Sequence, residues 1–484
     1  MTALPGISLD VPTGVYIDGR WGEGGGGTFD VLDPSTGEVL ATVADSDTAD
    51  ADRALAAATA AAPGWAATAP RERSIVLRRA FELMVEHADD LARLMSLEMG
   101  KSLTDARGEV TYAAEFFRWY SEEAVRIGGE LRTAPSGANR IVTFKKPVGV
   151  SLLLTPWNFP AAMATRKLGP ALAAGCTTIC KPAEDTPLTV LLLAQLLTEA
   201  GAPAGVVNVL PVSTPGPLVE HLLDDPRVRK VSFTGSTRVG ALLLGQAARN
   251  ITSASMELGG NAPFLVCDDA DLDAAVEGAM LAKMRNGGEA CTAANRFIVH
   301  RSVAEEFTRR LAERMGALTV GPGSEEGTQV GPMINARAVQ GIADKVDRTL
   351  AAGARAVIGG TTPDGPGFFY PPTVLADVPA DAPAAVEEVF GPVAPVIPVD
   401  DDDEAVRIAN GTEMGLTGYV FTRDLARGLR LSERLEVGMV GLNRGLVSDP
   451  AAPFGGVKQS GLGREGGYEG VEEYLETTYV ATTW

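Results

Sequence analysis

From about residue 148 onward the chain alternates short apolar runs with helical segments, and this pattern restricts the possible folds more than any other feature of the sequence. Such alternation is typical of parallel strands connected by crossover helices. The predicted strands are GVSLLLT (149–155), CTTICK (176–181), VVNVLP (206–211), KVSFTG (230–235) and SASMELGG (253–260). The intervening helices are predicted to begin near Pro160, Thr186, Pro215 and Ser236. We therefore expect an α/β protein with a Rossmann-type parallel sheet.

A second alternating region, from about residue 262 to residue 440, predicts a second α/β domain. Its predicted strands are APFLV (262–266), RFIVH (296–300), APVIPV (394–399) and GYVFT (418–422). The spacing of apolar residues before the first sheet predicts helices, which cover 47–62, 71–100 and 108–126. The final segment, 473–484, is β-rich, and as an exposed edge strand it is expected to pair with a partner subunit.

The composition argues against several classes of partner. With 42 Lys and Arg against 62 Asp and Glu, the net charge of -20 disfavours nucleic acid and anionic membranes and favours a soluble protein. We expect no secretory signal, and the sequence TPWNFP (155–160) interrupts the longest uncharged stretch, so no membrane span is expected. Four cysteines are too few for a disulfide framework here, which favours a cytoplasmic location. The three histidines lack ligand spacing, so no metal site is expected.

The carboxyl ends of the predicted strands are the expected binding positions, because ligands of parallel α/β sheets bind there. The segments at these ends are TPWN (155–158), KPAE (181–184), TGS (234–236) and ELGG (257–260). The amides and helix dipole at Ser236 can receive a pyrophosphate. Glu184 can accept hydrogen bonds from an adenosine ribose and would repel a 2'-phosphate, which favours NAD over NADP. Taken alone, KPAE is equally compatible with a surface lysine and a helix N-terminal acid.

Cys291 differs from the other three cysteines of the chain. Free cysteines are usually packing residues, and Cys176, Cys180 and Cys267 each lie in or beside an apolar strand. Cys291 lies in GGEACTAAN, where small neighbours allow a substrate to approach closely. The following TAAN (292–295) is expected to begin a helix whose dipole lowers the thiol pKa. These features favour a nucleophile.

Two further residues have the chemistry that a cysteine nucleophile requires. Attack on a carbonyl produces an oxyanion that needs a hydrogen-bond donor, and release of the acyl group needs a base. Asn158 can be the donor and Glu257 the base. Asn158 could instead cap a helix and Glu257 could be a loop acid. Their common position at the carboxyl ends of one predicted sheet favours the catalytic interpretation.

These segments together resemble the aldehyde dehydrogenase superfamily over nearly the whole chain. The motifs, in the family's order, are TPWNFP, KPAE, FTGSTRVG, MELGGN, GGEACTAANR, EEVFGP (387–392) and PFGGVKQSGLGREG (453–466). The resemblance implies an NAD-dependent enzyme that works through a thiohemiacetal and a thioester on Cys291, with the Cys291 amide and Asn158 as oxyanion hole and Glu257 as base. The implied cofactor contacts are Thr155, Pro156, Trp157, Lys181, Glu184, Gly235, Ser236, Glu388 and Phe390.

The resemblance also implies a division of the chain. Residues 1–128 and 147–259 would form the NAD-binding domain, and residues 260–464 the catalytic domain. Residues 129–146 and 465–484 would form an oligomerisation element that joins subunits into a homodimer or homotetramer.

Substrate choice depends on residues that flank these motifs. TRKLGPALAAGCT, KMRNGGEAC and GLVS resemble the succinate semialdehyde dehydrogenase branch, which implies that Arg166, Arg285 and Ser448 hold a substrate carboxylate and that Phe159 lines the tunnel. Without the resemblance, Arg285 could be an exposed surface charge, and Arg166 could be a residue on a helix face. A broader enzyme for glutarate semialdehyde or neutral aldehydes, or a non-catalytic member, is the alternative. That branch often has a second cysteine at the position of Ala293, so no local disulfide switch is expected.

Overall fold

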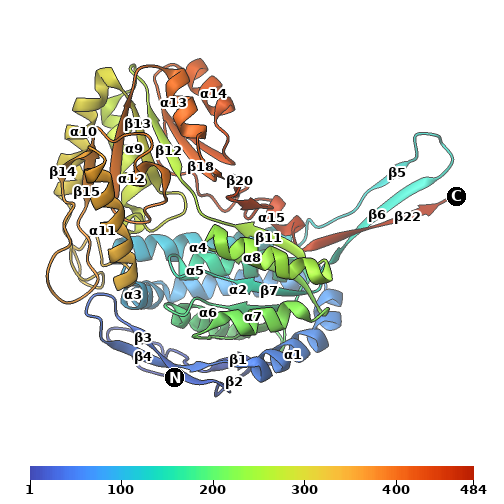
Figure 1. Cartoon of the computed structure of the whole chain (residues 1–484). Coiled ribbons are helices and arrows are strands. Elements are labelled where there is room, and N and C mark those ends of the chain that lie inside the picture. Colours follow the sequence, from blue (N-terminus) through green and yellow to red (C-terminus); the bar gives the residue numbers. More distant parts are fainter.

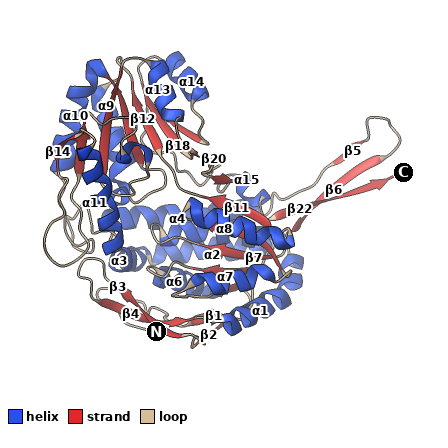
Figure 2. Ribbon diagram, viewed as in Figure 1, coloured by secondary structure: helices blue, strands red, loops and turns tan.

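The computed structural model describes all 484 residues, which form two lobes and a projecting arm (Figure 1). The lower lobe comes from the first half of the chain, and the upper lobe comes from most of the second half. Each lobe is built on one sheet with helices packed against it (Figure 2). This α/β architecture confirms the predicted fold class. No helix combines the length and the apolar character needed to cross a bilayer.

The lower sheet has the strand order β2-β1-β9-β8-β7-β10-β11-β21. Its strands are β2 (Arg20–Gly22), β1 (Val15–Ile17), β9 (Val207–Val209), β8 (Thr178–Lys181), β7 (Val150–Leu154), β10 (Val228–Thr234), β11 (Ser253–Glu257) and β21 (Gly461–Leu462). The run from β9 to β11 is parallel throughout, so all predicted strands of this region are confirmed. The strand order reverses between β7 and β10, and such a switch point opens a crevice for a ligand.

Helices cover both faces of the lower sheet. They are α1 (Thr48–Ala67), α2 (Pro70–Glu86), α3 (Ala88–Met99), α4 (Leu103–Glu123), α5 (Pro160–Ala174), α6 (Pro187–Glu199), α7 (Pro215–Asp224) and α8 (Thr237–Ala247). On one face, Leu153 packs with α2 to α6, and on the other, Leu152 and Leu154 pack with α1, α7 and α8. The single helix predicted over 71–100 is wrong, because the non-helical backbone of His87 separates α2 from α3.

The upper sheet has the order β14-β15-β16-β13-β12-β18-β19. Its strands are β14 (Arg355–Ile358), β15 (Thr373–Ala376), β16 (Val393–Val399), β13 (Ala294–His300), β12 (Ala262–Val266), β18 (Thr417–Phe421) and β19 (Met439–Leu442). Its helices are α9 (Leu272–Met284), α10 (Arg301–Gly316), α11 (Ala336–Ala351), α12 (Pro383–Val386), α13 (Asp402–Asn410) and α14 (Leu425–Arg434). The four predicted strands are confirmed, whereas β14, β15 and β19 have no counterpart in the prediction.

The arm is a three-stranded antiparallel sheet that projects from the lower lobe (Figure 1). It consists of β5 (Leu131–Thr133), β6 (Arg140–Pro147) and β22 (Leu475–Thr482). The C-terminal segment is therefore a strand, as predicted, and it pairs with β6 of the same chain along its whole length. The other edge of β22 is unpaired.

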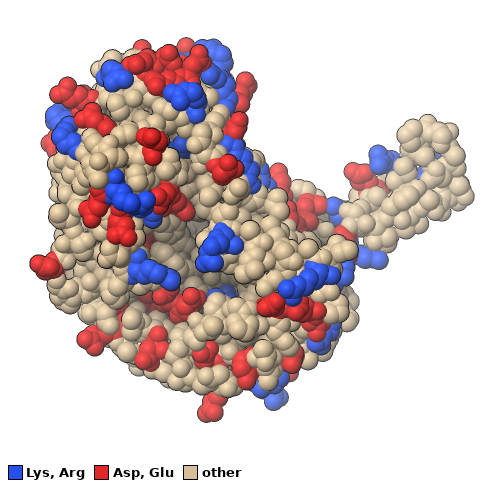
Figure 3. All heavy atoms as spheres, in the orientation of Figure 1, with Lys and Arg blue, Asp and Glu red and all other residues tan.

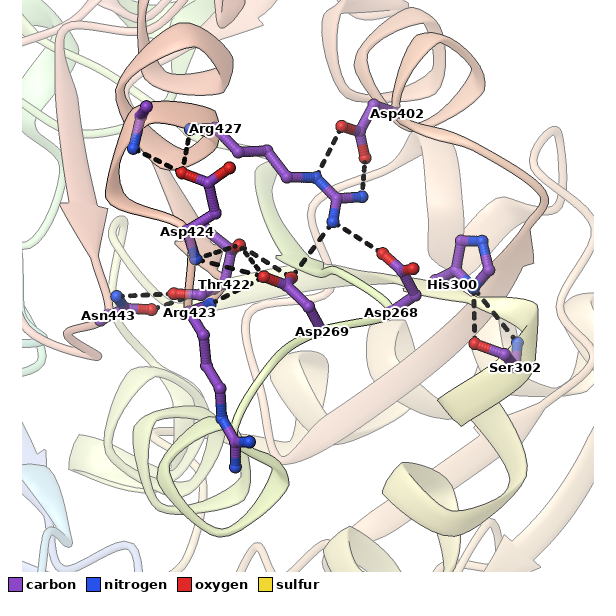
Figure 4. A network of polar contacts seen from close by, with 11 residues as sticks. Asp268, Asp269, His300, Ser302, Asp402, Thr422, Arg423, Asp424, Arg427 and Asn443 are labelled. Atoms are coloured by element: carbon purple, nitrogen blue, oxygen red, sulfur yellow. Dashed lines mark hydrogen bonds and ion pairs between the residues drawn. The ribbon is translucent and has the colours of Figure 1, made fainter.

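The carboxyl end of the upper sheet is filled by an ion-pair network around Arg427 of α14 (Figure 4). Its guanidinium contacts Asp402 through Nε (2.8 Å) and Nη2 (2.6 Å). Its Nη1 lies 2.6 Å from Asp268 and 3.1 Å from Asp269, which follow β12 after Cys267. One guanidinium thus contacts three carboxylates that come together where β12 and β16 end.

We predict that Arg427→Met destabilises the protein by about 1–3 kcal/mol at neutral pH, because it leaves these carboxylates without their cation. The hydrogen bond from Arg427 lowers the pKa of Asp268, so this stabilisation is present above the ordinary Asp pKa and is lost as the pH falls. The Tm difference from the parent should therefore shrink below about pH 4. Differential scanning fluorimetry across pH measures this. Arg309→Met, on the exposed face of α10, is the control and should leave the Tm nearly unchanged; an equal effect of both variants would contradict the prediction.

Candidate active site

A cavity of about 240 Å³ lies where the carboxyl end of the lower sheet faces the amino end of the upper sheet. Figure 3 shows this face of the molecule hollowed between the lobes. The lining residues are Pro156, Trp157, Asn158, Met163, Thr234, Gly235, Ser236, Glu257, Leu258, Gly259, Cys291, Glu388 and Phe390. The structure thus brings together predicted residues from TPWN, TGS, ELGG, the Cys291 segment and EEVFGP.

The chain turns sharply just before Cys291. Asn286, Gly287 and Gly288 all have positive φ values, of 57°, 60° and 81°. A Cβ atom on Gly288 would lie 2.3 Å from the carbonyl oxygen of Gly391, so a larger residue would not fit there. Cys291 is half-buried, and its backbone amide donates to no other group of the chain. This amide is therefore free to donate to a bound molecule.

The expected helix after Cys291 is wrong, because Ala294–His300 form strand β13, so this segment supplies no helix dipole to the thiol. Burial raises the thiol pKa to about 12, although the nearby Arg166 acts in the opposite direction. The thiol is thus protonated in the resting chain, and reaction at its sulfur requires removal of the proton.

Asn158 is held directly against the Cys291 segment. Its side-chain Nδ2 donates to the carbonyl oxygen of Glu289 over 2.9 Å. A carboxamide carries two N–H donors, and the second has no acceptor within the chain. Asn158 is only 5% exposed and lines the cavity together with Cys291. The arrangement offers one free side-chain donor beside the thiol.

Glu257 ends strand β11 and lies on the cavity wall. Both carboxyl oxygens are buried and neither has a hydrogen-bond partner. Burial raises the pKa of Glu257 well above its ordinary value, and the nearby Glu465 adds to this, while Arg166 opposes it. A carboxyl group of this kind is a stronger base than a solvated one once it is deprotonated.

Glu388 and Phe390 enter the cavity from the upper lobe. The backbone amide of Gly260 donates to Glu388 Oε1 over 3.1 Å. Phe390, with a positive φ of 58°, packs edge-on against Trp157 at a ring-centroid distance of 5.5 Å. Ser236 lines the same cavity, and helix α8 begins directly after it, as the strand-turn-helix motif predicted.

A second recess of about 240 Å³ lies beside the first cavity, starting at Leu154 and Thr155. Its walls are mostly apolar, and they are formed by Leu154, Thr155, Lys181, Pro215, Gly216, Val219, Phe233, Val239, Leu242, Leu243 and Gln246. Lys181 Nζ lies 3.4 Å from Glu184, which remains half-exposed. The sequence predicted Thr155 and Lys181 as cofactor contacts, but not the apolar residues of α7 and α8. A helix face that packs in a core and one that binds a ring have the same apolar pattern in the sequence.

The proposed carboxylate-binding residues differ in their partners. Arg285 is half-buried, lies over the Phe159 ring at 4.9 Å, and makes no ion pair. Arg166 is fully buried, and its Nε lies 2.7 Å from Glu465. Its Nη2 has no hydrogen-bond partner. Arg296, at the end of the same motif, instead donates to the Asn261 carbonyl over 2.6 Å and is therefore a structural residue.

Tyr112 of α4 was not identified from the sequence. Its hydroxyl is buried without a hydrogen-bond partner and lies near Arg166, Arg285 and Ser448. These polar groups come from α4, α5, the Cys291 segment and a loop near residue 448. No local pattern could have grouped them, because each belongs to a different part of the chain.

Comparisons with known proteins agree with this geometry. A model of the aldehyde dehydrogenase family matches residues 21–480. A succinate-semialdehyde dehydrogenase from Paenarthrobacter nicotinovorans is 58% identical over 91% of this chain and 98% of its own length. A glutarate-semialdehyde dehydrogenase from Pseudomonas putida is 48% identical over 96% of each chain. The crystal structure of an NADP-dependent enzyme from E. coli superposes with a TM-score of 0.96, at 46% identity and 98% coverage of both chains.

The raised pKa of Cys291 predicts how the thiol is alkylated in the absence of other molecules. Only the thiolate reacts, so the rate of modification by iodoacetamide should rise about tenfold per pH unit from about pH 7 to about pH 9. Mass spectrometry of the tryptic peptide 286–296, which contains no other cysteine, measures this rate. A plateau below about pH 8 would show instead that the thiol is activated at rest.

Proposed function

This chain belongs to the aldehyde dehydrogenase family, and we propose that it oxidises succinate semialdehyde to succinate with NAD. The observation that carries the choice of substrate is the half-buried Arg285, which has no anionic partner in a chain of net charge -20. With the free Nη2 of Arg166, Ser448 and the Tyr112 hydroxyl, it forms a cluster of polar groups suited to a carboxylate. The relative from Paenarthrobacter nicotinovorans, which carries that activity in its name, supports the same substrate.

We assign the chemistry to the residues around the cavity. Once the Cys291 thiol has lost its proton to solvent, its sulfur adds to the aldehyde carbon to form a thiohemiacetal, and the Asn158 carboxamide and the Cys291 amide donate to the oxyanion. When bound, NAD supplies the acceptor for the hydride that this carbon loses, which leaves a thioester. Glu257 then takes a proton from water as the water attacks the thioester, so that the acid is released and the thiol is restored.

The family uses NAD(P), and the residues of this chain fit such a cofactor. The apolar recess between α7 and α8 suits an adenine ring, Lys181 and Glu184 would contact the adenosine ribose, and Ser236 begins α8 at the switch point of the sheet. Thr155, Pro156, Trp157 and Gly235 would complete the cleft, with Glu388 and Phe390 at the nicotinamide end. We favour NAD over NADP because Glu184 would repel a 2'-phosphate, although the E. coli relative is described as NADP-dependent.

The assembly and organisation of the enzyme are part of the same proposal. The arm exposes Leu131, Tyr479 and Trp484, and it leaves one edge of β22 unpaired, which supports subunit association as a homodimer or homotetramer. Analytical ultracentrifugation would distinguish these states from a monomer.

The proposal divides the chain into an NAD-binding domain (1–128 and 147–259), a catalytic domain (260–464) and an oligomerisation element (129–146 and 465–484). A cytoplasmic location is favoured by the small number of cysteines.

Arg285→Met should lower kcat/KM for succinate semialdehyde by about 10- to 100-fold, because a charge-assisted contact is worth about 1.5–3 kcal/mol. The same variant should leave kcat/KM for butanal, which has the same number of carbons, within about threefold of the parent. Steady-state NADH formation with both aldehydes measures this.

Arg309→Met on exposed α10 is the control for loss of one positive charge and should change neither value. Equal losses for both aldehydes in Arg285→Met would contradict a carboxylate-reading role. If glutarate semialdehyde exceeded succinate semialdehyde in kcat/KM with the parent enzyme, the alternative substrate would replace the proposed one.

Glu184→Ser should raise kcat/KM for NADP by about tenfold or more, because it removes a negative charge from the position expected for the 2'-phosphate. The value for NAD should fall, since the ribose loses an acceptor. Glu199→Ser, at the exposed end of α6, is the matched control. An unchanged NADP to NAD ratio in Glu184→Ser would place the ribose elsewhere.

A further inference from the structure

A buried ion pair between Lys101 and Glu109 lies behind Asn158, outside the cavity lining. Lys101 belongs to the short connection between α3 and α4, and Glu109 lies on α4. Both side chains are completely shielded from solvent. Burying two charges is costly unless each also satisfies hydrogen-bonding groups, so the other contacts of this pair indicate what it does.

Glu109 supplies the missing cap of α5. This helix begins at Pro160, and Phe159 at its N-cap offers no side-chain acceptor. Glu109 Oε1 instead accepts hydrogen bonds from the amides of Ala161 (2.9 Å) and Ala162 (3.1 Å). These amides are among those that a helix start leaves without an intrahelical acceptor. A carboxylate at this end is also favoured by the helix dipole. Glu109 therefore fixes α5 directly after Asn158.

Lys101 fixes the backbone of Asn158 itself. Its Nζ donates to the Asn158 carbonyl oxygen over 2.7 Å and lies 4.2 Å from the centroid of the Phe159 ring. The side chain of Asn286, from the segment before Cys291, donates to the same carbonyl over 3.0 Å. Two donors from different parts of the chain thus hold the peptide group that follows Asn158.

We propose that Lys101 and Glu109 are positioning residues that hold the Asn158 carboxamide in the direction required to donate to the oxyanion. This inference rests on the role given to Asn158 under Proposed function. One N–H of the carboxamide is already engaged by the Glu289 carbonyl, so the direction of the second N–H is set by the Asn158 backbone. Lys101 holds that backbone on one side and Glu109 anchors the helix that follows it.

The test is a double-mutant cycle on the rate of the first NADH formation, measured by stopped flow with the aldehyde that the parent oxidises fastest. The paired change Lys101→Met with Glu109→Gln removes the donor to Asn158 and leaves no unpaired charge. We expect it to slow this step by about 10- to 100-fold while the Kd for NAD stays within about threefold. Added to Asn158→Ala, the same pair should slow the step by less than about twofold, because its effect acts through Asn158.

Glu98→Gln is the matched control, because Glu98 is a buried glutamate that caps the neighbouring helix α6 through the amides of Leu188 and Thr189 and does not contact Asn158. It is expected to lower stability but not the rate of NADH formation. If the paired variant does not fold, Glu109→Asp tests the same role, since it keeps an anion beside Lys101 but withdraws the carboxylate from the amides of Ala161 and Ala162.

Each outcome separates the two proposals. A parent-like rate in the paired variant, or a full additional loss in the Asn158→Ala background, would overturn the positioning role. A parent-like rate in Asn158→Ala itself would instead overturn the oxyanion role of Asn158. A slow step in the Asn158→Ala and paired variants, without a further loss on combining them, supports both.

Discussion

The hydrogen bond from the Asn158 carboxamide to the Glu289 carbonyl is the contact on which the geometry of the site depends. Asn158 follows a strand of the lower sheet, whereas Glu289 precedes Cys291 and a strand of the upper sheet. Each sheet is a rigid scaffold, but a scaffold alone does not place a donor of one lobe beside a thiol of the other. Because reactivity falls steeply when reacting groups are misplaced by about 1 Å, a direct bond between the two segments is what makes the site a single unit.

The two sheets contribute to this site from opposite ends. The lower sheet follows the usual rule, with TPWN, TGS and ELGG leaving its carboxyl end at the switch point between β7 and β10. The upper sheet contributes residues that precede its strands, and its own carboxyl end is occupied by the Arg427 network (Figure 4). A ligand site and a stabilising ion network thus lie at opposite ends of one sheet.

Two buried carboxyl groups near the cavity, Glu465 and Glu257, have pKa values that are shifted in opposite directions. Burial alone would raise the pKa of Glu465, but ion pairs with Lys167 and Arg166 lower it. Glu257 has no such partner, and burial raises its pKa. Neighbouring carboxyl groups whose pKa values are shifted in opposite directions are suited to different tasks. The unpartnered Glu257 is the one that can exchange a proton with water during a reaction.

The sequence by itself determined the parallel strands of both lobes, the helix starts at Pro160 and Pro215, and the polar segments at the strand ends, because hydrophobic periodicity and turn residues are local signals. It did not reveal β14 and β19, because these edge strands are partly exposed and lack a fully apolar run, and it also missed the buried β15. Only the tertiary structure decided that Cys291 precedes a strand and has a raised pKa, that Arg166 is paired while Arg285 is not, and that Lys101 lies behind Asn158. The physical reason is that burial and ion pairing depend on neighbours that are distant in the chain, and these come together only when the sheets pack.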